Sequence, residues 1–145
     1  MTKQLTHYVG GAHREGASGR YADVYNPSTG QVQAQVPLGS ADEVREVITN
    51  AAKAQTGWAE TNPQKRARVL HRFVDLVNEH ADELAELLSL EHGKTIADAH
   101  GDIQRGLDVV EFATAAPHLL KGEYSDAVGT GIEVYSMRQP LGVVA

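Results

Sequence analysis

The chain has 145 residues, of which 41% are hydrophobic and 22% are charged, as in an ordinary globular protein with one modest core. Its net charge of -6 and its scattered basic residues disfavour nucleic acid as a partner, because phosphate binding needs clustered Lys and Arg. The absence of cysteine excludes disulfides, thiolate metal sites and a cysteine nucleophile within these residues.

The N-terminal part is predicted to consist of short strands and turns. Residues 1–5 lack the apolar centre of a signal peptide, and no later window has the length of a membrane span, so we expect a cytoplasmic protein without a membrane partner. Residues 8–11 (Tyr-Val-Gly-Gly) are typical of a strand that enters a turn, and residues 26–30 (Asn-Pro-Ser-Thr-Gly) of a turn. Between residues 32 and 38 apolar and polar side chains alternate, which predicts a half-buried strand with Pro37 at its end.

The middle of the chain predicts amphipathic helices. Ser40 with Glu43 forms a capping box at the start of the first helix, and Pro63 after Asn62 marks the start of the second. The third helix is expected to stop near Gly93, and the fourth to start at Thr95 and to end before Pro117. The apolar side chains expected to face a partner layer are Val44, Val47, Ile48, Ala51, Ala67, Leu70, Phe73, Val74, Val77, Leu84, Leu87, Leu88, Ile96, Ala99, Ile103, Leu107 and Val110.

After Gly122 the pattern returns to strands. Residues 129–131 (Gly-Thr-Gly) predict a turn, which an alternating segment from Ile132 follows. Residues 142–145 begin an apolar run typical of a buried parallel strand, and we interpret Ala145 as a truncation point because native termini are usually solvated. Helices with strands at both ends do not close a core, so we expect their apolar stripes to pack on a sheet beyond residue 145.

These features, in this order, resemble the start of the aldehyde dehydrogenase superfamily. The matching segments are residues 8–11, 26–30 and 32–38, Trp58 with Pro63, Arg66 and Leu70, the Glu91-His92-Gly93-Lys94 motif, and residues 138–144. Within the superfamily, residues 101–113, 115–117 and 135–142 look like the CoA-acylating methylmalonate-semialdehyde dehydrogenase branch.

The resemblance implies an α/β fold built around a doubly wound, Rossmann-like NAD-binding domain. Residues 1–122 would be the N-terminal helical and hairpin part of that discontinuous domain. Residues 123–140 would be oligomerisation strands, and residues 141–145 the start of a buried parallel strand of the nucleotide-binding sheet. The strand at 132–139 would add to a neighbouring subunit in a homodimer or homotetramer. The alternative is an ordinary intramolecular hairpin.

The resemblance also implies a reaction: oxidation of a small aldehyde, (methyl)malonate semialdehyde, through a cysteine thiohemiacetal, with NAD as hydride acceptor, transfer of the acyl group to coenzyme A, and decarboxylation to propionyl-CoA or acetyl-CoA. The family's catalytic Cys, its oxyanion-hole Asn and its nucleotide-binding loop follow the last residue here. The chain therefore supplies no catalytic and no cofactor-binding residue, and we expect it to be inactive alone. The alternatives are a non-acylating enzyme that releases its product with water, and a self-contained, non-catalytic helical interaction module.

Arg105 is the one candidate substrate-binding residue. In the resembling family its helix borders the substrate tunnel, and a guanidinium suits a carboxylated semialdehyde because it pairs bidentately. Gly101 and Gly106 lie within the same predicted helix at a cost of about 1 kcal/mol each, which suggests a close approach to the backbone. The alternative is that Arg105 only pairs with Asp102 or Asp108, each three residues away. Both interpretations remain open at the level of the sequence.

Three other features have simpler explanations than a site. Gly93-Lys94-Thr95 is similar to the end of a phosphate-binding loop, but Leu88 replaces the required glycine and a helix precedes it, so a helix stop and a cap explain it better. The seven histidines lack metal-ligand spacing, so we expect no metal site. Trp58, between the first two helices, is expected to be a core plug.

Overall fold

The computed structural model describes residues 2–145, and its N-terminal part holds two small strand assemblies. Strand β4 (Tyr21–Tyr25) pairs antiparallel with β5 (Val32–Pro37), and β1 (Lys3–Gln4) joins the other edge of β5 in parallel. Strands β2 (His7–Val9) and β3 (Ala12–Arg14) form a separate hairpin, whose turn residues Gly10 and Gly11 have positive φ. The predicted strand at 32–38 and the predicted turns at 8–11 and 26–30 are thus confirmed.

The predicted helix boundaries are confirmed in detail. The helices are α1 (Ala41–Glu60), α2 (Pro63–Glu79), α3 (Ala81–His92), α4 (Ile96–Thr114) and the short α5 (Ala116–Leu119). Ser40 and Glu43 form both hydrogen bonds of the capping box, and the Asn62 side chain accepts from the Gln64 N–H just ahead of α2. Gly93 ends α3 in the left-handed region at a φ of 82°.

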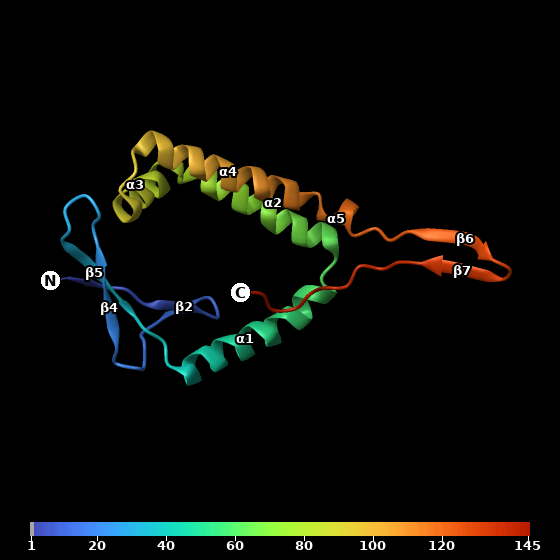
Figure 1. Cartoon of the computed structure of the whole chain (residues 1–145), viewed down its shortest axis with the longest axis horizontal. Coiled ribbons are helices and arrows are strands. Elements are labelled where there is room, and N and C mark those ends of the chain that lie inside the picture. The colour runs from blue at the N-terminus through green and yellow to red at the C-terminus, as the bar shows by residue number, and fades with distance from the viewer. Residues whose placement is uncertain (1) are drawn as a thin grey trace.

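The helices do not close on a single core. Helices α2, α3 and α4 pack together. Helix α1 diverges from them, so that an open angle lies between α1 and the other three helices (Figure 1). Only six apolar side chains are buried among the described residues: Ala34, Pro37, Ala67, Ala85, Ala99 and Leu107. The exposed surface is 11055 Å², against roughly 7,200 Å² for a compact monomer of this mass. This openness disfavours the self-contained helical module.

The predicted apolar stripes are formed but largely uncovered. On α1, Val44, Val47 and Ile48 are each about half exposed. Between α2, α3 and α4 an apolar hollow of about 330 Å³ is lined by Phe73, Val77, Leu84, Leu88, Ile103, Gly106, Leu107 and Val110. These faces have the pattern of one side of a layered domain whose other side must come from elsewhere.

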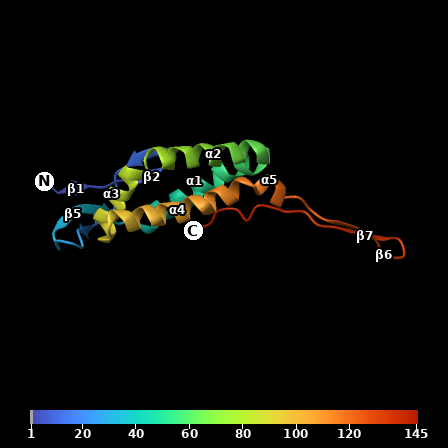
Figure 2. The same ribbon diagram turned by 90° about the horizontal axis from the view of Figure 1, so that it is seen from above.

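Strands β6 (Tyr124–Gly129) and β7 (Ile132–Tyr135) form a hairpin that projects away from the helices (Figures 1 and 2). Its base is closed twice: the Ser136 N–H donates to the Glu123 carbonyl at 2.8 Å, and the Glu123 N–H donates to Ser136 Oγ at 3.0 Å. A register shift interrupts the pairing, and Ala127 within it has a φ of 50°. Every residue of the two strands except Gly129 is exposed.

The strand expected over residues 141–145 is not formed in this structure. The segment passes along α1 and pairs with no strand among residues 2–145, and Leu141 is 95% exposed. A parallel strand needs a neighbour to receive its backbone hydrogen bonds, and no described strand offers one here. The proposed division at residues 122 and 140 stays a prediction. Among residues 2–145, none of the helices combines the length and the apolar character that a membrane crossing requires.

Candidate functional site

A cluster of four charged side chains extends from the connection before α4 to the middle of that helix. Helix α3 ends at Gly93, Lys94 occupies the connection, and Thr95 caps α4 by accepting from the Asp98 N–H. Asp98, Asp102 and Arg105 then recur every three or four residues, which places them on one face of the helix. The fold therefore gathers two cations and two carboxylates from twelve consecutive residues.

The contacts within this charge cluster run from Lys94 to Arg105. Lys94 Nζ lies 2.9 Å from Asp98 Oδ2 and also contacts Asp102 Oδ2. Arg105 Nη1 lies 2.5 Å from Asp102 Oδ1. The two oxygens of Asp102 are thus divided between Lys94 and Arg105.

Each central partner keeps the other ionised. The hydrogen bond from Lys94 lowers the pKa of the Asp102 carboxyl, and the nearby charge of Arg105 acts in the same direction. The hydrogen bonds to Asp102 and then to Asp98 raise the pKa of Lys94. At neutral pH the two cations therefore balance the two carboxylates, and the charge cluster has no net charge.

Arg105 and Lys94 differ in exposure. The Lys94 side chain is 12% exposed, while that of Arg105 is 72% exposed. Of the two pairings considered for Arg105, the structure forms the one with Asp102, whereas Asp108 accepts a hydrogen bond from Gln104 at 2.8 Å. A guanidinium has five N–H donors, so one bond to Asp102 leaves donors free for a second anion. The substrate role of Arg105 stays a prediction.

The two glycines of α4 do not mark a close approach within the described residues. A Cβ on Gly101 would lie 3.9 Å from Arg105 Nη1, which is ordinary contact, and one on Gly106 would meet nothing within 4 Å. Gly106 instead lines the apolar hollow between α2, α3 and α4. Within residues 2–145 neither glycine is pressed by another group, so the close approach expected from these glycines stays a prediction.

The connection that carries Lys94 rests on the turn between β4 and β5. A Cβ on Gly93 would lie 2.9 Å from Pro27 Cγ, so the backbone approaches Pro27 closely. Gln33 Nε2 donates to Glu91 Oε1 at 3.2 Å, and Ser89 Oγ donates to the Lys94 carbonyl at 2.7 Å. Two of the resemblance motifs, 26–30 and 91–94, thus meet here. Gly93 and Thr95 serve as the predicted helix stop and cap, and no phosphate loop is formed.

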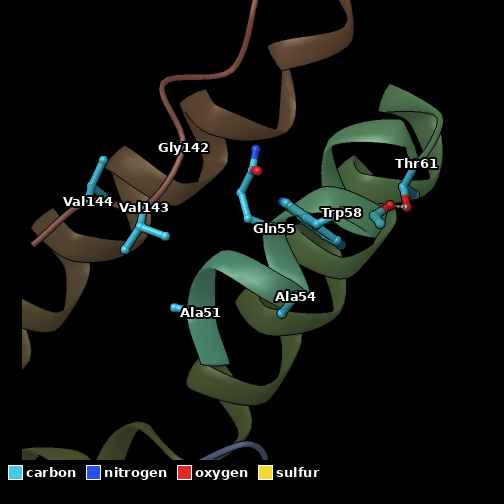
Figure 3. Close-up of a pocket in the computed structure, with 9 residues that line it drawn as sticks. Ala51, Ala54, Gln55, Trp58, Thr61, Gly142, Val143 and Val144 are labelled. Atoms are coloured by element: carbon cyan, nitrogen blue, oxygen red, sulfur yellow. Dashed lines mark hydrogen bonds between the residues drawn. The ribbon is translucent and has the colours of Figure 1, made fainter. Parts of the chain in front are cut away.

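A second, larger hollow lies elsewhere and is apolar. It measures about 610 Å³ and lies between α1 and residues 142–144, as Figure 3 shows. Gln55 and Thr61 are its polar side chains besides the Trp58 indole, and the Thr61 hydroxyl already donates to the Gly57 carbonyl at 2.8 Å. No charged or titratable side chain lines the hollow, so its described walls hold no catalytic group.

Two further expectations can be compared with the structure. Trp58 was expected to be a core plug, but it is 46% exposed because α1 diverges from the other helices. His80 and His100 each pair with one carboxylate, Glu83 at 3.1 Å and Asp82 at 3.3 Å. Within the described part of the chain, no group of three or more metal-binding side chains comes together.

Sequence patterns left the Lys94 pairing unrecognised. The signal was present, because Lys94, Asp98 and Asp102 follow one another at intervals of four residues and end beside Arg105. Such spacing places opposite charges on neighbouring turns of a helix.

The order of the motifs and the helix-and-strand arrangement can be compared with known families. A model of the family described as "Aldehyde dehydrogenase family" matches residues 13–145. The chain belongs to the aldehyde dehydrogenase family. The resemblance inferred from the sequence is thereby confirmed.

Relatives of this aldehyde dehydrogenase chain have a consistent name. The malonate-semialdehyde dehydrogenase of Pseudomonas aeruginosa is 48% identical over 128 residues, which cover 88% of this chain and 26% of the relative. Malonate-semialdehyde dehydrogenase 2 of Oceanobacillus iheyensis is 42% identical over 142 residues, covering 98% of this chain and 29% of the relative. The chain thus spans less than a third of the length of these curated relatives.

Solved structures give the same placement of the fold. A putative methylmalonate-semialdehyde dehydrogenase from Sinorhizobium meliloti, complexed with NAD, superposes with a TM-score of 0.90 at 50% identity, covering 98% of this chain and 29% of that one. The methylmalonate-semialdehyde dehydrogenase of Oceanimonas doudoroffii superposes with a TM-score of 0.90 at 43% identity, covering 97% of this chain and 28% of that one. The predicted fold class, the N-terminal portion of the NAD-dependent aldehyde dehydrogenase fold, is confirmed.

Proposed function

We propose that this chain is part of an enzyme that oxidises malonate semialdehyde or its methyl derivative and forms an acyl-CoA. The names of its relatives support the substrate, and residues 101–113 resemble the acylating branch. The overall reaction would convert malonate semialdehyde, CoA and NAD⁺ to acetyl-CoA, CO₂ and NADH, with propionyl-CoA from the methyl derivative. The cytoplasmic location expected from the sequence stays a prediction.

One observation carries the assignment of a substrate class to this chain's own residues: Arg105 presents an exposed guanidinium that is held at one end by Asp102. In this proposal Arg105 binds the carboxylate of the semialdehyde through its free N–H donors. A fixed guanidinium can hold a carboxylate by two parallel hydrogen bonds, which fixes both the position and the direction of the substrate. Arg105 would thereby orient the aldehyde end towards groups supplied by the remainder of the enzyme.

The residues of this chain do not fit the cofactors by themselves. The sequence has no cysteine for an acyl-enzyme, and the Lys94 ammonium is held by Asp98 and Asp102 and is not free for a phosphate. The described segments offer no glycine-rich loop between a strand and a helix of the kind that binds a dinucleotide. We therefore assign NAD and coenzyme A to the remainder of the enzyme, and we expect the 145-residue chain to be inactive alone.

The β6–β7 hairpin is proposed to mediate assembly. Within residues 2–145 its strands pair only with each other, so each has an outer edge with free backbone groups, and they project well away from the helices. We propose that the segment at 132–139 adds to a neighbouring subunit in a homodimer or homotetramer. Light scattering of the full-length enzyme should give a mass of at least two subunits, and a monomer would end this part of the proposal.

Product analysis of the full-length enzyme tests the reaction. NADH formation from malonate semialdehyde should require CoA, and mass spectrometry should identify acetyl-CoA. NADH with release of the free acid in the absence of CoA would instead establish the non-acylating alternative. The proposed substrate would be wrong if the enzyme oxidised neither semialdehyde but turned over an uncharged aldehyde such as propanal normally.

A further inference from the structure

The charge cluster on the first half of α4 contains a residue that the proposed substrate contact does not use. Lys94 is the least exposed of the four side chains, yet it is a cation, and its Nζ reaches two carboxylates. One of them is the same Asp102 that holds Arg105. How strongly Asp102 binds Arg105 therefore depends on whether Lys94 already occupies one of the two Asp102 oxygens.

We propose that Lys94 is a positioning residue, which keeps Arg105 available for the substrate carboxylate by occupying one oxygen of Asp102. The proposal rests on the proposed role of Arg105. With Lys94 in place, Asp102 offers Arg105 only its Oδ1, and the charges balance. Without Lys94, the same face would hold one cation and two carboxylates. Asp102 would compete more strongly for the guanidinium, and the net negative charge would repel an incoming anion.

The surroundings of Lys94 suit such a role. Its carbonyl is held by Ser89 Oγ, and the preceding Gly93 lies against Pro27, so the backbone is fixed without the help of the side chain. The raised pKa of Lys94 shows that its charged form is favoured by both carboxylates. Since the stem of a lysine packs as an apolar chain, Lys94→Leu removes the charge and retains much of the packing.

The first experiment compares kinetics of the full-length enzyme and its Lys94→Leu variant. The KM for malonate semialdehyde should rise roughly two- to fivefold, the range expected for loss of one partly exposed charge interaction. The KM for propanal, which lacks a carboxylate, should change far less. Lys94→Arg should restore the KM, and added salt should reduce the difference because it screens the charges. Lys53→Leu is the matched control, since Lys53 lies on α1 and forms no ion pair within residues 2–145.

A second variant balances the charges again. Lys94→Leu combined with Asp102→Asn leaves Asp98 and Arg105, with no net charge, and should return the KM for the semialdehyde to nearly the parent value. Asp102→Asn alone adds one net positive charge and should lower that KM. This single variant gives an answer even if Lys94→Leu fails to fold. A KM that rises equally for both aldehydes, or that stays raised in the double variant, would show that Lys94 is only structural.

Arg105→Leu separates this inference from the proposed function. If Arg105→Leu raises the KM for the semialdehyde selectively and Lys94→Leu does not, only the role of Lys94 is overturned. If Arg105→Leu affects both aldehydes alike, the carboxylate site itself is overturned.

Discussion

The Glu43 carboxylate accepts a hydrogen bond from the Ala17 backbone N–H at 2.6 Å, which ties the loop before β4 to the first turn of α1. Its other oxygen accepts from the Ser40 N–H at 2.7 Å as part of the capping box. One side chain thus fixes both the start of a helix and a loop 26 residues earlier in the sequence. The negative charge of the ionised carboxylate strengthens both hydrogen bonds.

Glu43 should therefore make stability depend on acid pH. The hydrogen bonds from the Ser40 and Ala17 N–H groups lower the pKa of Glu43 from 4.5 to about 2. Because the pKa is lower in the folded state, the stabilisation is complete above pH 4.5 and is lost as the pH falls towards 2. In thermal denaturation, Glu43→Gln should have a lower midpoint than the parent at neutral pH, and the difference should shrink on acidification.

Glu60→Gln is a suitable control for this prediction, because Glu60 ends α1 and its side chain forms no hydrogen bond or ion pair within residues 2–145. Its midpoint should follow that of the parent at every pH. A difference between Glu43→Gln and the parent that does not vary from neutral pH to the acid range would contradict the proposed linkage.

The close approach of Gly93 to Pro27 gives a prediction about folding stability. Gly93→Ala would place a Cβ 2.9 Å from Pro27 Cγ in a residue with a φ of 82°, so the variant meets both a steric and a backbone penalty. We expect a loss of about 1–3 kcal/mol in urea unfolding. The double variant Pro27→Ala/Gly93→Ala should be less destabilised relative to Pro27→Ala, because the steric part is gone. Equal losses in both backgrounds would leave the left-handed backbone as the whole cause.

The base of the β6–β7 hairpin should tolerate no side chain at Gly122. A Cβ there would overlap the Ser136 carbonyl oxygen, which is backbone and cannot rotate away. Gly122→Ala should therefore displace one side of the hairpin and shift the full-length enzyme towards smaller species in light scattering. Gly57→Ala is the control, since a Cβ at that helical position meets nothing within 4 Å of the described chain. An unchanged mass for Gly122→Ala would argue against the hairpin as the assembly element.

Local chemistry explains why the helices and turns could be predicted from the sequence. The residues that begin or end the helices act on backbone groups within a few residues, so their roles follow from sequence spacing alone. They are Ser40 with Glu43, Pro63, Gly93 and Thr95. The family resemblance was likewise carried by short segments in a fixed order.

Contacts between distant segments could not be predicted in the same way. The spacing of Ser40 and Glu43 indicates a cap, but nothing in it indicates that Glu43 also binds Ala17. Apolar residues predict the burial of Trp58 and a strand at 141–145. An apolar side chain is buried, and an apolar segment forms a strand, only where a partner is present. Arg105 is an intermediate case. Helix spacing predicts Asp102 as its neighbour, and the four-residue interval also indicates Lys94 as a partner of Asp102, but the spacing does not show that each cation takes a different oxygen of Asp102.

Arg105→Leu provides the most direct test of the carboxylate site in the full-length enzyme. A leucine retains apolar bulk on α4 but removes the cation, so the enzyme should lose affinity for a carboxylated semialdehyde and keep much of its affinity for propanal. A hydrogen bond to a charged group contributes about 1.5–3 kcal/mol, which corresponds to roughly a 10- to 150-fold loss of kcat/KM. Steady-state kinetics on malonate semialdehyde and on propanal measure both values.

Arg45→Leu is matched to this variant, because Arg45 also pairs with an aspartate three residues earlier, Asp42, and its side chain is also 72% exposed. Removing such an exposed helix pair costs little stability, so Arg45→Leu should have parent-like kinetics with both aldehydes. A selective loss in Arg105→Leu alone then assigns the effect to the position of the guanidinium in the middle of α4. Comparable losses on malonate semialdehyde and propanal would remove Arg105 from the carboxylate site and leave its bond to Asp102 as a surface ion pair.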